Sequence, residues 1–296
     1  MAKQSGFASA AELLPSLVKS AQALARPPIS NYHVGTVGLG STGRIFFGAN
    51  IEFPGLPLNN SIHAEQFLVT NLSLNAEPSL PCFAVSAAPC GHCRQFLQEL
   101  RAAPGIRILI TDDNNNNADD NNHHRLRRRY QDLSTILPHR FGPDDLLSKD
   151  VPLILERHNN DLALVIPPLE NGNLNGGGGN HGKEEDLKLE ALEAANRSHA
   201  PYSKCPSGVA LMDCEGKVYR GSYMESAAYN PSLGPVQAAI VAYIVGGGAG
   251  YERIVAAALV EKEGVPVMQE ATARLLLATV APKCELKVFH CRSKRQ

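Results

Sequence analysis

The sequence has no apolar run approaching the roughly 20 residues that a membrane-spanning helix requires, and it has no excess of charge of one sign. Its 28 Lys and Arg residues oppose 29 Asp and Glu residues, which gives a net charge of −1. Such a chain has no overall field that favours nucleic acid or an anionic membrane, although a local patch could still exist. Residues 1–25 are amphipathic and lack the apolar core of a signal peptide. We therefore expect a cytoplasmic protein without a membrane or nucleic-acid partner.

A disulfide framework is also not indicated. The 7 cysteines are an odd number in a long chain without a secretion signal, which favours reduced thiols. Any closely spaced pair is then a metal or redox candidate, and Cys90 and Cys93 form such a pair. With 296 residues, 44% of them hydrophobic, the chain can bury a sizeable core and exceeds the size of a common domain.

Two low-complexity stretches interrupt the chain: an Asp/Asn/His run over 112–124 and a Pro/Gly/Asn segment over 167–182. Neither can offset the entropy of ordering by burying apolar surface, so both are predicted to be loops or linkers. The second is the better domain boundary. The predicted organisation is a helical segment over 1–29, a first domain over 30–166, a linker over 167–183 and a second domain over 184–296.

Hydrophobic periodicity predicts helices that alternate with apolar strands. In the first half we expect helices over 8–25, 62–74 and 90–102, a hairpin of strands over 32–39 and 44–53, and strands over 82–87 and 106–111. In the second half we expect helices over 184–198 and 232–245, a hairpin over 208–223 and a strand over 253–260. The order is the same in both halves, which predicts a duplicated, layered α/β fold with helices on both faces of each sheet.

The most informative pattern is His63-Ala64-Glu65 at the start of one predicted helix and Pro89-Cys90-Gly91-His92-Cys93 at the start of another. Zinc accepts thiolate and imidazole ligands, and a catalytic site supplies three protein ligands and leaves the fourth position to water. Cys90 and Cys93 lie one helical turn apart at a helix N-terminus, which favours thiolates. Glu65 would stand beside the metal as a general acid and base.

His-x-Glu followed by Pro-Cys-x-x-Cys is the signature of zinc deaminases. A redox Cys-x-x-Cys or a pair of buried thiols is the alternative interpretation, but it leaves His63 and Glu65 unexplained. Several longer segments extend the resemblance, which spans most of the chain: 48–53 (GANIEF), 63–66 (HAEQ), 89–96 (PCGHCRQF), 141–146 (FGPDDL) and 195–211 (ANRSHAPYSKCPSGVAL). Together they resemble the long, two-repeat, homodimeric class of cytidine deaminase.

The resemblance implies zinc-dependent hydrolytic deamination of cytidine and deoxycytidine to uridine and deoxyuridine, with release of ammonia, in pyrimidine salvage. Carried over by position, it implies one zinc ion per chain bound by His63, Cys90 and Cys93, with Glu65 as the catalytic proton carrier. It implies a substrate site in which Asn50 and Glu52 hold the ribose hydroxyls, Tyr32 and Ala64 line the pocket, and Phe141 enters from the neighbouring subunit of a homodimer.

Other interpretations stay open for the residues outside the metal motif. Asn50 and Glu52 alone would indicate a strand-end turn with solvated polar groups, and Phe141 alone would indicate a core residue of its own domain. The G-x-G-x-x-G over 38–43 precedes a strand pattern, so a hairpin turn is favoured over a nucleotide site. The basic cluster over 125–129 favours a solvated face, and His92 is expected outside the ligand set.

The second half lacks the deaminase chemistry, because Gly234-Pro235-Val236-Gln237 stands where the first half has His63-Ala64-Glu65-Gln66. We therefore expect a structural and interface role for this degenerate half. Two other functions remain: a polynucleotide cytosine deaminase, which would need a basic channel, and a non-catalytic zinc-binding interaction module, which would usually need a fourth protein ligand.

Overall fold

The computed structural model describes residues 6–111, 129–165 and 181–294. The chain forms two compact units: residues 1–156 with 226–232, and residues 157–225 with 233–296. The first boundary lies ahead of the predicted one at residue 166, because a short strand over 162–164 pairs with the last strand of the second unit. The Asp/Asn/His run, the linker up to residue 180 and the basic cluster up to residue 128 lie outside the described residues.

The first unit contains a five-stranded sheet in the order β2-β1-β3-β4-β5, in which only β3 and β4 are parallel. The strands are β1 (Gly35–Leu39), β2 (Ile45–Ala49), β3 (Cys82–Val85), β4 (Arg107–Ile110) and β5 (Gln131–Asp132). The helices are α1 (Ala10–Gln22), α2 (Ala64–Leu74), α3 (Gly91–Phe96), α5 (Leu133–Ile136) and α6 (Pro143–Leu146), with 3₁₀ turns η2 (Leu58–Asn60), η3 (Leu97–Glu99) and η4 (Ala103–Gly105).

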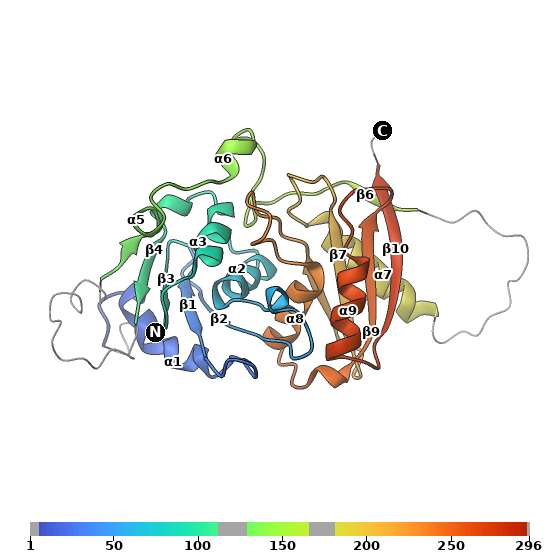
Figure 1. Cartoon of the computed structure of the whole chain (residues 1–296), viewed down its shortest axis with the longest axis horizontal. Coiled ribbons are helices and arrows are strands. Elements are labelled where there is room, and N and C mark those ends of the chain that lie inside the picture. The colour runs from blue at the N-terminus through green and yellow to red at the C-terminus, as the bar shows by residue number, and fades with distance from the viewer. Residues whose placement is uncertain (1–5, 112–128, 166–180, 295–296) are drawn as a thin grey trace, which may run out of the picture. The chain divides into compact units, whose positions relative to one another are not determined.

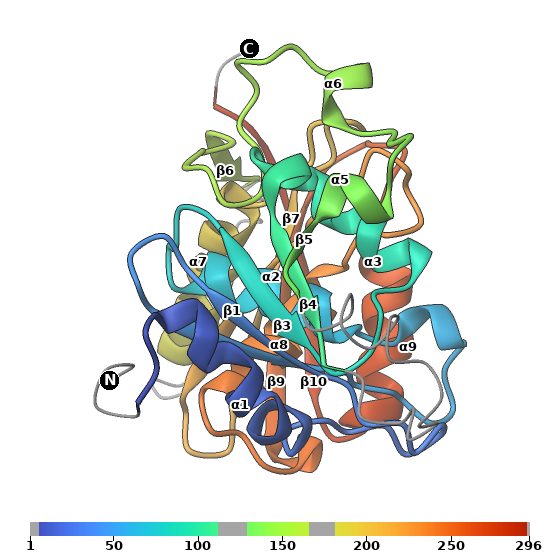
Figure 2. The ribbon, with the colours of Figure 1, turned by 90° about the vertical axis from the view of Figure 1, so that its left-hand side faces the viewer.

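Alternation along β1 explains why both faces of this sheet carry a helix. Val37 packs against Leu14 and Val18 of α1, whereas the neighbouring Gly38 lies against Leu68 of α2. Successive residues of a strand point to opposite faces, so one apolar strand serves both helices. Figure 2 shows α1 in front of the sheet and α2 behind it.

The second unit contains a sheet in the order β6-β10-β9-β7-β8, with β9 and β10 parallel. Its strands are β6 (Leu162–Leu164), β7 (Ser207–Asp213), β8 (Val218–Ser222), β9 (Ile254–Lys262) and β10 (Glu285–Ser293) (Figure 1). Its helices are α7 (His181–Asn196), α8 (Pro235–Val245) and α9 (Glu270–Val280), and η5 (Tyr251–Arg253) is a 3₁₀ turn. The predicted duplicated α/β fold is confirmed.

The duplication extends to single backbone contacts. In the first unit Ile51 bridges Ile62, and in the second Met224 bridges Leu233 in the same antiparallel way. Gly35 of β1 and Gly208 of β7 lie so close to α1 and α7 that a Cβ at either position would meet the helix backbone. The same small residue is therefore required at the same place in both repeats.

One predicted element is shorter in the structure. The helix expected over 90–102 is α3 over Gly91–Phe96, followed by the 3₁₀ turn η3. The tighter turn accompanies a buried Glu99, whose carboxylate accepts a hydrogen bond from the backbone N–H of Ala227. Within the described ranges, no helix is long and apolar enough to cross a membrane.

Candidate functional site

The site lies where the N-termini of α2 and α3 meet in the first unit. His63 is the N-cap residue of α2 and follows the Ile51–Ile62 bridge, which anchors the chain just before the helix. Cys90 is the N-cap residue of α3, and Cys93 lies in the first turn of that helix. Cys90 and His63 are 27 residues apart in the sequence, and their side chains meet in the structure.

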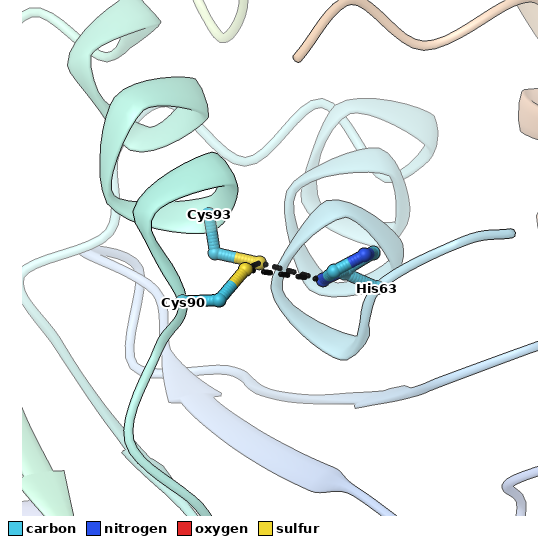
Figure 3. Close-up of side chains that lie close together, drawn as sticks. All are labelled: His63, Cys90 and Cys93. Atoms are coloured by element: carbon cyan, nitrogen blue, oxygen red, sulfur yellow. Dashed lines mark hydrogen bonds between the residues drawn. The ribbon is translucent and has the colours of Figure 1, made fainter. Parts of the chain in front are cut away.

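Three donor atoms form a compact triangle, and Figure 3 shows the side chains of Cys90 and Cys93 pointing towards the ring of His63. The Nδ1 atom of His63 lies 3.5 Å from Cys90 Sγ and 3.2 Å from Cys93 Sγ, and the two sulfurs are 3.7 Å apart. Tetrahedral zinc with its usual bond lengths needs about 3.8 Å between sulfurs and about 3.6 Å between sulfur and nitrogen. The donor set and its spacing therefore fit zinc.

The electrostatics of the triangle favour a cation. The hydrogen bond from Cys93, with a further contribution from His63, lowers the pKa of Cys90 to about 3 although burial opposes it. The same contact with Cys90, together with burial, raises the pKa of Cys93, and the hydrogen bond to Cys90 raises the pKa of His63. A cation between the three donors would take the place of the protons on His63 and Cys93.

Glu65 lies beside this triangle and outside it. Its side chain is 4% exposed, and its Oε2 atom is 3.2 Å from the sulfur of Cys93. Burial raises the pKa of Glu65 above its usual value of 4.5. A raised pKa makes a carboxyl group easier to protonate, which suits a general acid and base.

His92 lies outside the donor set, as predicted, but it has a structural contact that the sequence did not indicate. Its ring stacks on the ring of His63, with centroids 4.8 Å apart and an angle of 5° between the planes. The spacing Cys90-x-His92 contains no signal for this stack, because the partner ring belongs to a different helix.

A cavity of about 320 Å³ opens onto the donor triangle, which is within the range of about 300–1,000 Å³ for small-ligand pockets. It brings together Tyr32, Asn50, Glu52, Ala64 and Glu65 with the three donors. The lining residues that sequence reasoning missed are Ser30, Val34, Ile51, Ser61, Ile62, Ala87 and Ala88. They carry no motif of their own and are found only by their position.

Two of the predicted site residues need a separate comment. Phe141 does not line this cavity and is 44% exposed in the single chain. Tyr32 also borders a larger cavity of about 710 Å³ against α1. Among the described residues that line it, Lys19, His33 and Tyr32 are the only charged or titratable ones, and none carries a carboxylate or a thiol. The smaller cavity is therefore the candidate active site, because it contains both carboxyl groups and thiols.

Asn50 and Glu52 are held in place by the loop before β1. Asn50 accepts a hydrogen bond from the N–H of Val34 and donates one to the carbonyl of Tyr32, both at 2.9 Å. Glu52 accepts from the N–H groups of Ile29 and Ser30, at 2.8 and 2.9 Å, and from the Ser30 hydroxyl at 2.5 Å.

Both side chains keep capacity for a ligand. Burial alone would raise the pKa of Glu52, but the hydrogen bonds from Ser30 and Ile29 lower it below the usual value, so the carboxylate is ionised at neutral pH. A carboxylate has about four acceptor positions and an amide nitrogen has two hydrogens. Glu52 therefore keeps about one acceptor position, and Asn50 one donor, for a ligand in the cavity.

The second unit repeats the Glu52 turn, but no donor triangle is found among its described residues. Glu225 accepts from the N–H groups of Tyr202 and Ser203, at 3.0 and 3.1 Å, and from the Ser203 hydroxyl. The N-cap residue of α8 is Gly234, at the place that His63 has in α2. Among residues 6–111, 129–165 and 181–294, the single cluster of at least three possible metal donors is His63, Cys90 and Cys93.

Comparison with family models gives two matches along the chain. Residues 9–106 and residues 133–274 each match a model described as "Cytidine and deoxycytidylate deaminase zinc-binding region". One match covers the donor triangle, and the other covers the repeat in which no such triangle is found among the described residues.

Curated relatives match over nearly the full length. "Cytidine deaminase 1" of Arabidopsis thaliana is 64% identical over 98% of this chain and 94% of its own length. "Cytidine deaminase 6" of the same plant is 50% identical over 94% of this chain and 91% of its own length. Among solved structures, a cytidine deaminase from Mycobacterium tuberculosis is 25% identical, covers 45% of this chain and 98% of its own, and has a TM-score of 0.36.

Proposed function

The chain belongs to the cytidine and deoxycytidylate deaminase family, and from this premise we propose that it converts cytidine and deoxycytidine into uridine and deoxyuridine with release of ammonia. One observation carries the proposal: the His63, Cys90 and Cys93 donors lie beside a buried Glu65 in a cavity of nucleoside size. A purely structural zinc site would usually close with a fourth protein ligand, whereas this triangle opens onto the cavity.

His63, Cys90 and Cys93 would hold the zinc ion, and zinc bound there would supply a water molecule with a pKa of about 7 as the nucleophile for C4 of the pyrimidine. Glu65 takes the proton from that water and delivers it to N3 of the ring. It later passes a proton to the departing ammonia. Its burial suits this role, because a carboxyl group that is easily protonated can both accept and return a proton.

The remaining residues of the cavity bind and orient the nucleoside. Glu52 accepts from one ribose hydroxyl with its spare oxygen position, and Asn50 donates to the other with its free amide hydrogen. Tyr32 provides an aromatic surface for the base, and the small side chain of Ala64 leaves room for the ring. The position of the four side chains around one cavity supports these proposed roles.

The assembly and the cellular setting are also part of the proposal. We infer a homodimer in which Phe141, exposed in the single chain, completes the pocket of the neighbouring subunit. The seven cysteines are all free thiols in the structure, which suits a reducing cytoplasm. Pyrimidine salvage is the proposed purpose of the reaction, with free nucleosides and not nucleic acid as substrates.

The test is turnover by the purified, zinc-loaded protein, with free cytidine and deoxycytidine compared with single-stranded DNA and RNA that contain cytosine. We expect ammonia and uridine or deoxyuridine from the free nucleosides, and no uracil in the polynucleotides. Deamination of the polynucleotides alone would replace the proposal with a base-flipping enzyme. Zinc binding without turnover of any substrate would leave a binding module.

A further inference from the structure

A short segment from the second half of the sequence is part of the catalytic unit. Residues 226–232, here called the inserted segment, are grouped with the first unit although their chain neighbours on both sides belong to the second. Two buried side chains of the first unit bind its backbone. Glu99 accepts from the N–H of Ala227 at 2.7 Å, and Gln66 donates to the carbonyl of Pro231 at 3.0 Å.

Gln66 connects this segment to the donor triangle. Its Oε1 atom accepts a hydrogen bond from the backbone N–H of His63 at 3.1 Å, while its Nε2 atom donates to Pro231. The side chain is 1% exposed, so water cannot replace either bond. A displacement of the inserted segment therefore pulls directly on the residue that begins α2 and carries the imidazole donor.

His63 is held by one contact to its ring from α3 and one contact to its backbone from Gln66 of α2. Its imidazole stacks on His92, which fixes the plane of the ring, and its backbone is held through Gln66. A metal site keeps its function only when its donors are held within about 0.5 Å of their productive positions. The two contacts therefore act on different parts of His63: the stack with His92 orients the ring, and the hydrogen bond to Gln66 holds the backbone.

The second repeat provides an internal comparison. Gln237 occupies the same place three residues after the N-cap of α8, and it is 7% exposed. Its Oε1 atom is buried and has no hydrogen-bond partner among the described residues, so this oxygen does not accept from the backbone N–H of the N-cap residue. Burial of a glutamine at this helix position thus does not by itself produce the contact that Gln66 makes.

We propose that Gln66 is a positioning residue that couples the inserted segment to His63, so that a piece of the degenerate repeat sets the geometry of the zinc site. The proposal rests on the proposed function, because it assumes that the donor triangle holds zinc. It assigns to residues 226–232 a role in the active site that goes beyond support of the fold.

The first test compares three purified proteins: Gln66→Met, Gln66→Glu and the control Gln237→Met. Gln66→Met keeps the volume and removes both hydrogen bonds, whereas Gln66→Glu keeps an acceptor for His63 and loses the donor to Pro231. Changes in groups that support metal ligands typically cost about 10–100-fold in metal affinity. We expect both Gln66 variants to lose zinc to a chelator about 10–100 times faster, and Gln237→Met to behave as the wild type.

The visible spectrum of the cobalt-substituted proteins gives a readout that does not depend on turnover. We expect shifted ligand-field bands in both Gln66 variants and an unchanged spectrum in the control, with melting temperature recorded to confirm folding. Folded Gln66 variants with wild-type zinc retention and an unaltered cobalt spectrum would overturn the proposal. A wild type that binds zinc but turns over no nucleoside would instead defeat the proposed function.

A second variant acts on the inserted segment without touching α2. Glu99→Leu removes the acceptor for Ala227, and Glu99→Gln keeps an acceptor oxygen and serves as its control. We expect Glu99→Leu to shift the cobalt spectrum and zinc retention in the same direction as Gln66→Glu, to a smaller extent, with Glu99→Gln closer to the wild type. If Glu99→Leu is folded and leaves both properties unchanged, the coupling to the inserted segment is wrong and Gln66 serves only as a local cap.

Discussion

At the scale of single residues, the environment of Glu65 decides what its carboxyl group can do. Glu65→Gln preserves the shape of the side chain but removes the proton carrier. Since positioned acid–base catalysis typically contributes about 10²–10⁴-fold, we expect kcat to fall by at least that factor while zinc content stays at the wild-type level. Steady-state kinetics and metal analysis on the same sample check this. Wild-type turnover by the zinc-loaded variant would contradict the assignment.

Glu52 could serve substrate binding or only the stability of its turn. The same turn occurs around Glu225 in the repeat where no metal cluster is found among the described residues, so the turn alone does not require a substrate. Glu52→Gln leaves an amide where a carboxylate accepts three hydrogen bonds. We therefore expect a lower melting temperature and weaker binding of the ribose. A hydrogen bond to a charged group contributes about 1.5–3 kcal/mol, which corresponds to a rise in KM of about 10–100-fold.

Glu225→Gln is the matched control, since it disturbs the equivalent turn of the second unit, and its zinc retention is measured as well because Glu225 directly precedes the inserted segment. We expect its melting temperature to fall as that of Glu52→Gln does, with KM unchanged when zinc retention stays at the wild-type level. If both variants lose stability and both keep the wild-type KM, Glu52 belongs only to its turn and does not bind the nucleoside.

The residues of the metal motif could be predicted from sequence because thiolate and imidazole at helix starts have few other uses in combination. His63, Cys90 and Cys93 indeed lie together. The stack of His92 on His63 and the hydrogen bond from Gln66 to Pro231 could not be predicted, since each depends on a partner from another helix or from residues 226–232. Sequence patterns name the donors, while the contacts that hold the donors come from the tertiary structure.

At the scale of elements, the β1–β2 turn explains a glycine pattern that resembles a nucleotide-binding motif. The chain forms a hairpin there, as predicted, and Gly43 has a φ of +85°. A Cβ at Gly40 would collide with the carboxyl group of Glu77. That carboxylate is fully buried and accepts from Thr42 N at 2.8 Å and from Arg44 at 2.9 Å. Gly40 therefore makes room for a buried carboxylate, Gly38 for leucine side chains, and Gly43 allows the turn, so no phosphate is needed to explain the pattern.

This turn gives a prediction on stability. Burial would raise the pKa of Glu77, but hydrogen bonds from Thr42, Arg44 and Ser41 lower it below the usual 4.5. We expect Glu77→Gln to reduce the free energy of unfolding by about 1–3 kcal/mol at pH 7, because the amide cannot satisfy all of these donors.

The pH dependence of the Glu77 effect has a defined sign. A carboxyl group whose pKa is lower in the folded protein stabilises the fold fully above its unfolded pKa, and this contribution is lost as the pH falls through the folded pKa. The difference between the wild type and Glu77→Gln should therefore be constant near neutrality and should shrink below about pH 4.5. Denaturant unfolding at several pH values measures it, and a difference that grows towards acid would contradict the assignment.

The sequence predicts an element correctly where its hydrophobic pattern is strong. It misses elements whose formation depends on tertiary contacts. The helices α2 and α8 and both hairpins were predicted because their apolar residues are dense. The helix α9 and the strand β10 were not predicted, since half-buried residues dominate β10 and give no clear alternation. β5 and β6 are only two and three residues long, which is too short for any periodic signal.

At the scale of the whole molecule, the two repeats differ in metal chemistry. We expect one tightly bound zinc ion per chain, because one described cluster provides the three donors. Cys93→Ala should lose zinc and activity together, whereas Cys214→Ala, in the second unit and exposed, should keep both. Elemental analysis of the purified proteins checks the prediction. Two tightly bound zinc ions per chain would contradict it.

The assembly gives the last prediction, which concerns Phe141. This side chain is 44% exposed and does not line the cavity of its own chain, so in a homodimer it is available to the neighbouring pocket. Phe141→Ala and Glu65→Gln subunits should each be nearly inactive alone. After subunit exchange, half of the dimers contain both variants, and each of these has one pocket with both residues intact. We therefore expect about one quarter of the wild-type activity to return.

Native mass spectrometry must show that mixed dimers have formed before the activity of the mixture is interpreted. Recovery then means that a pocket draws Glu65 from one chain and Phe141 from the other, since neither variant can supply both residues for itself. If mixed dimers form and no activity returns, Phe141 acts only within its own subunit. In that case each subunit would hold a complete pocket, and the homodimer would have to be explained without a shared active site.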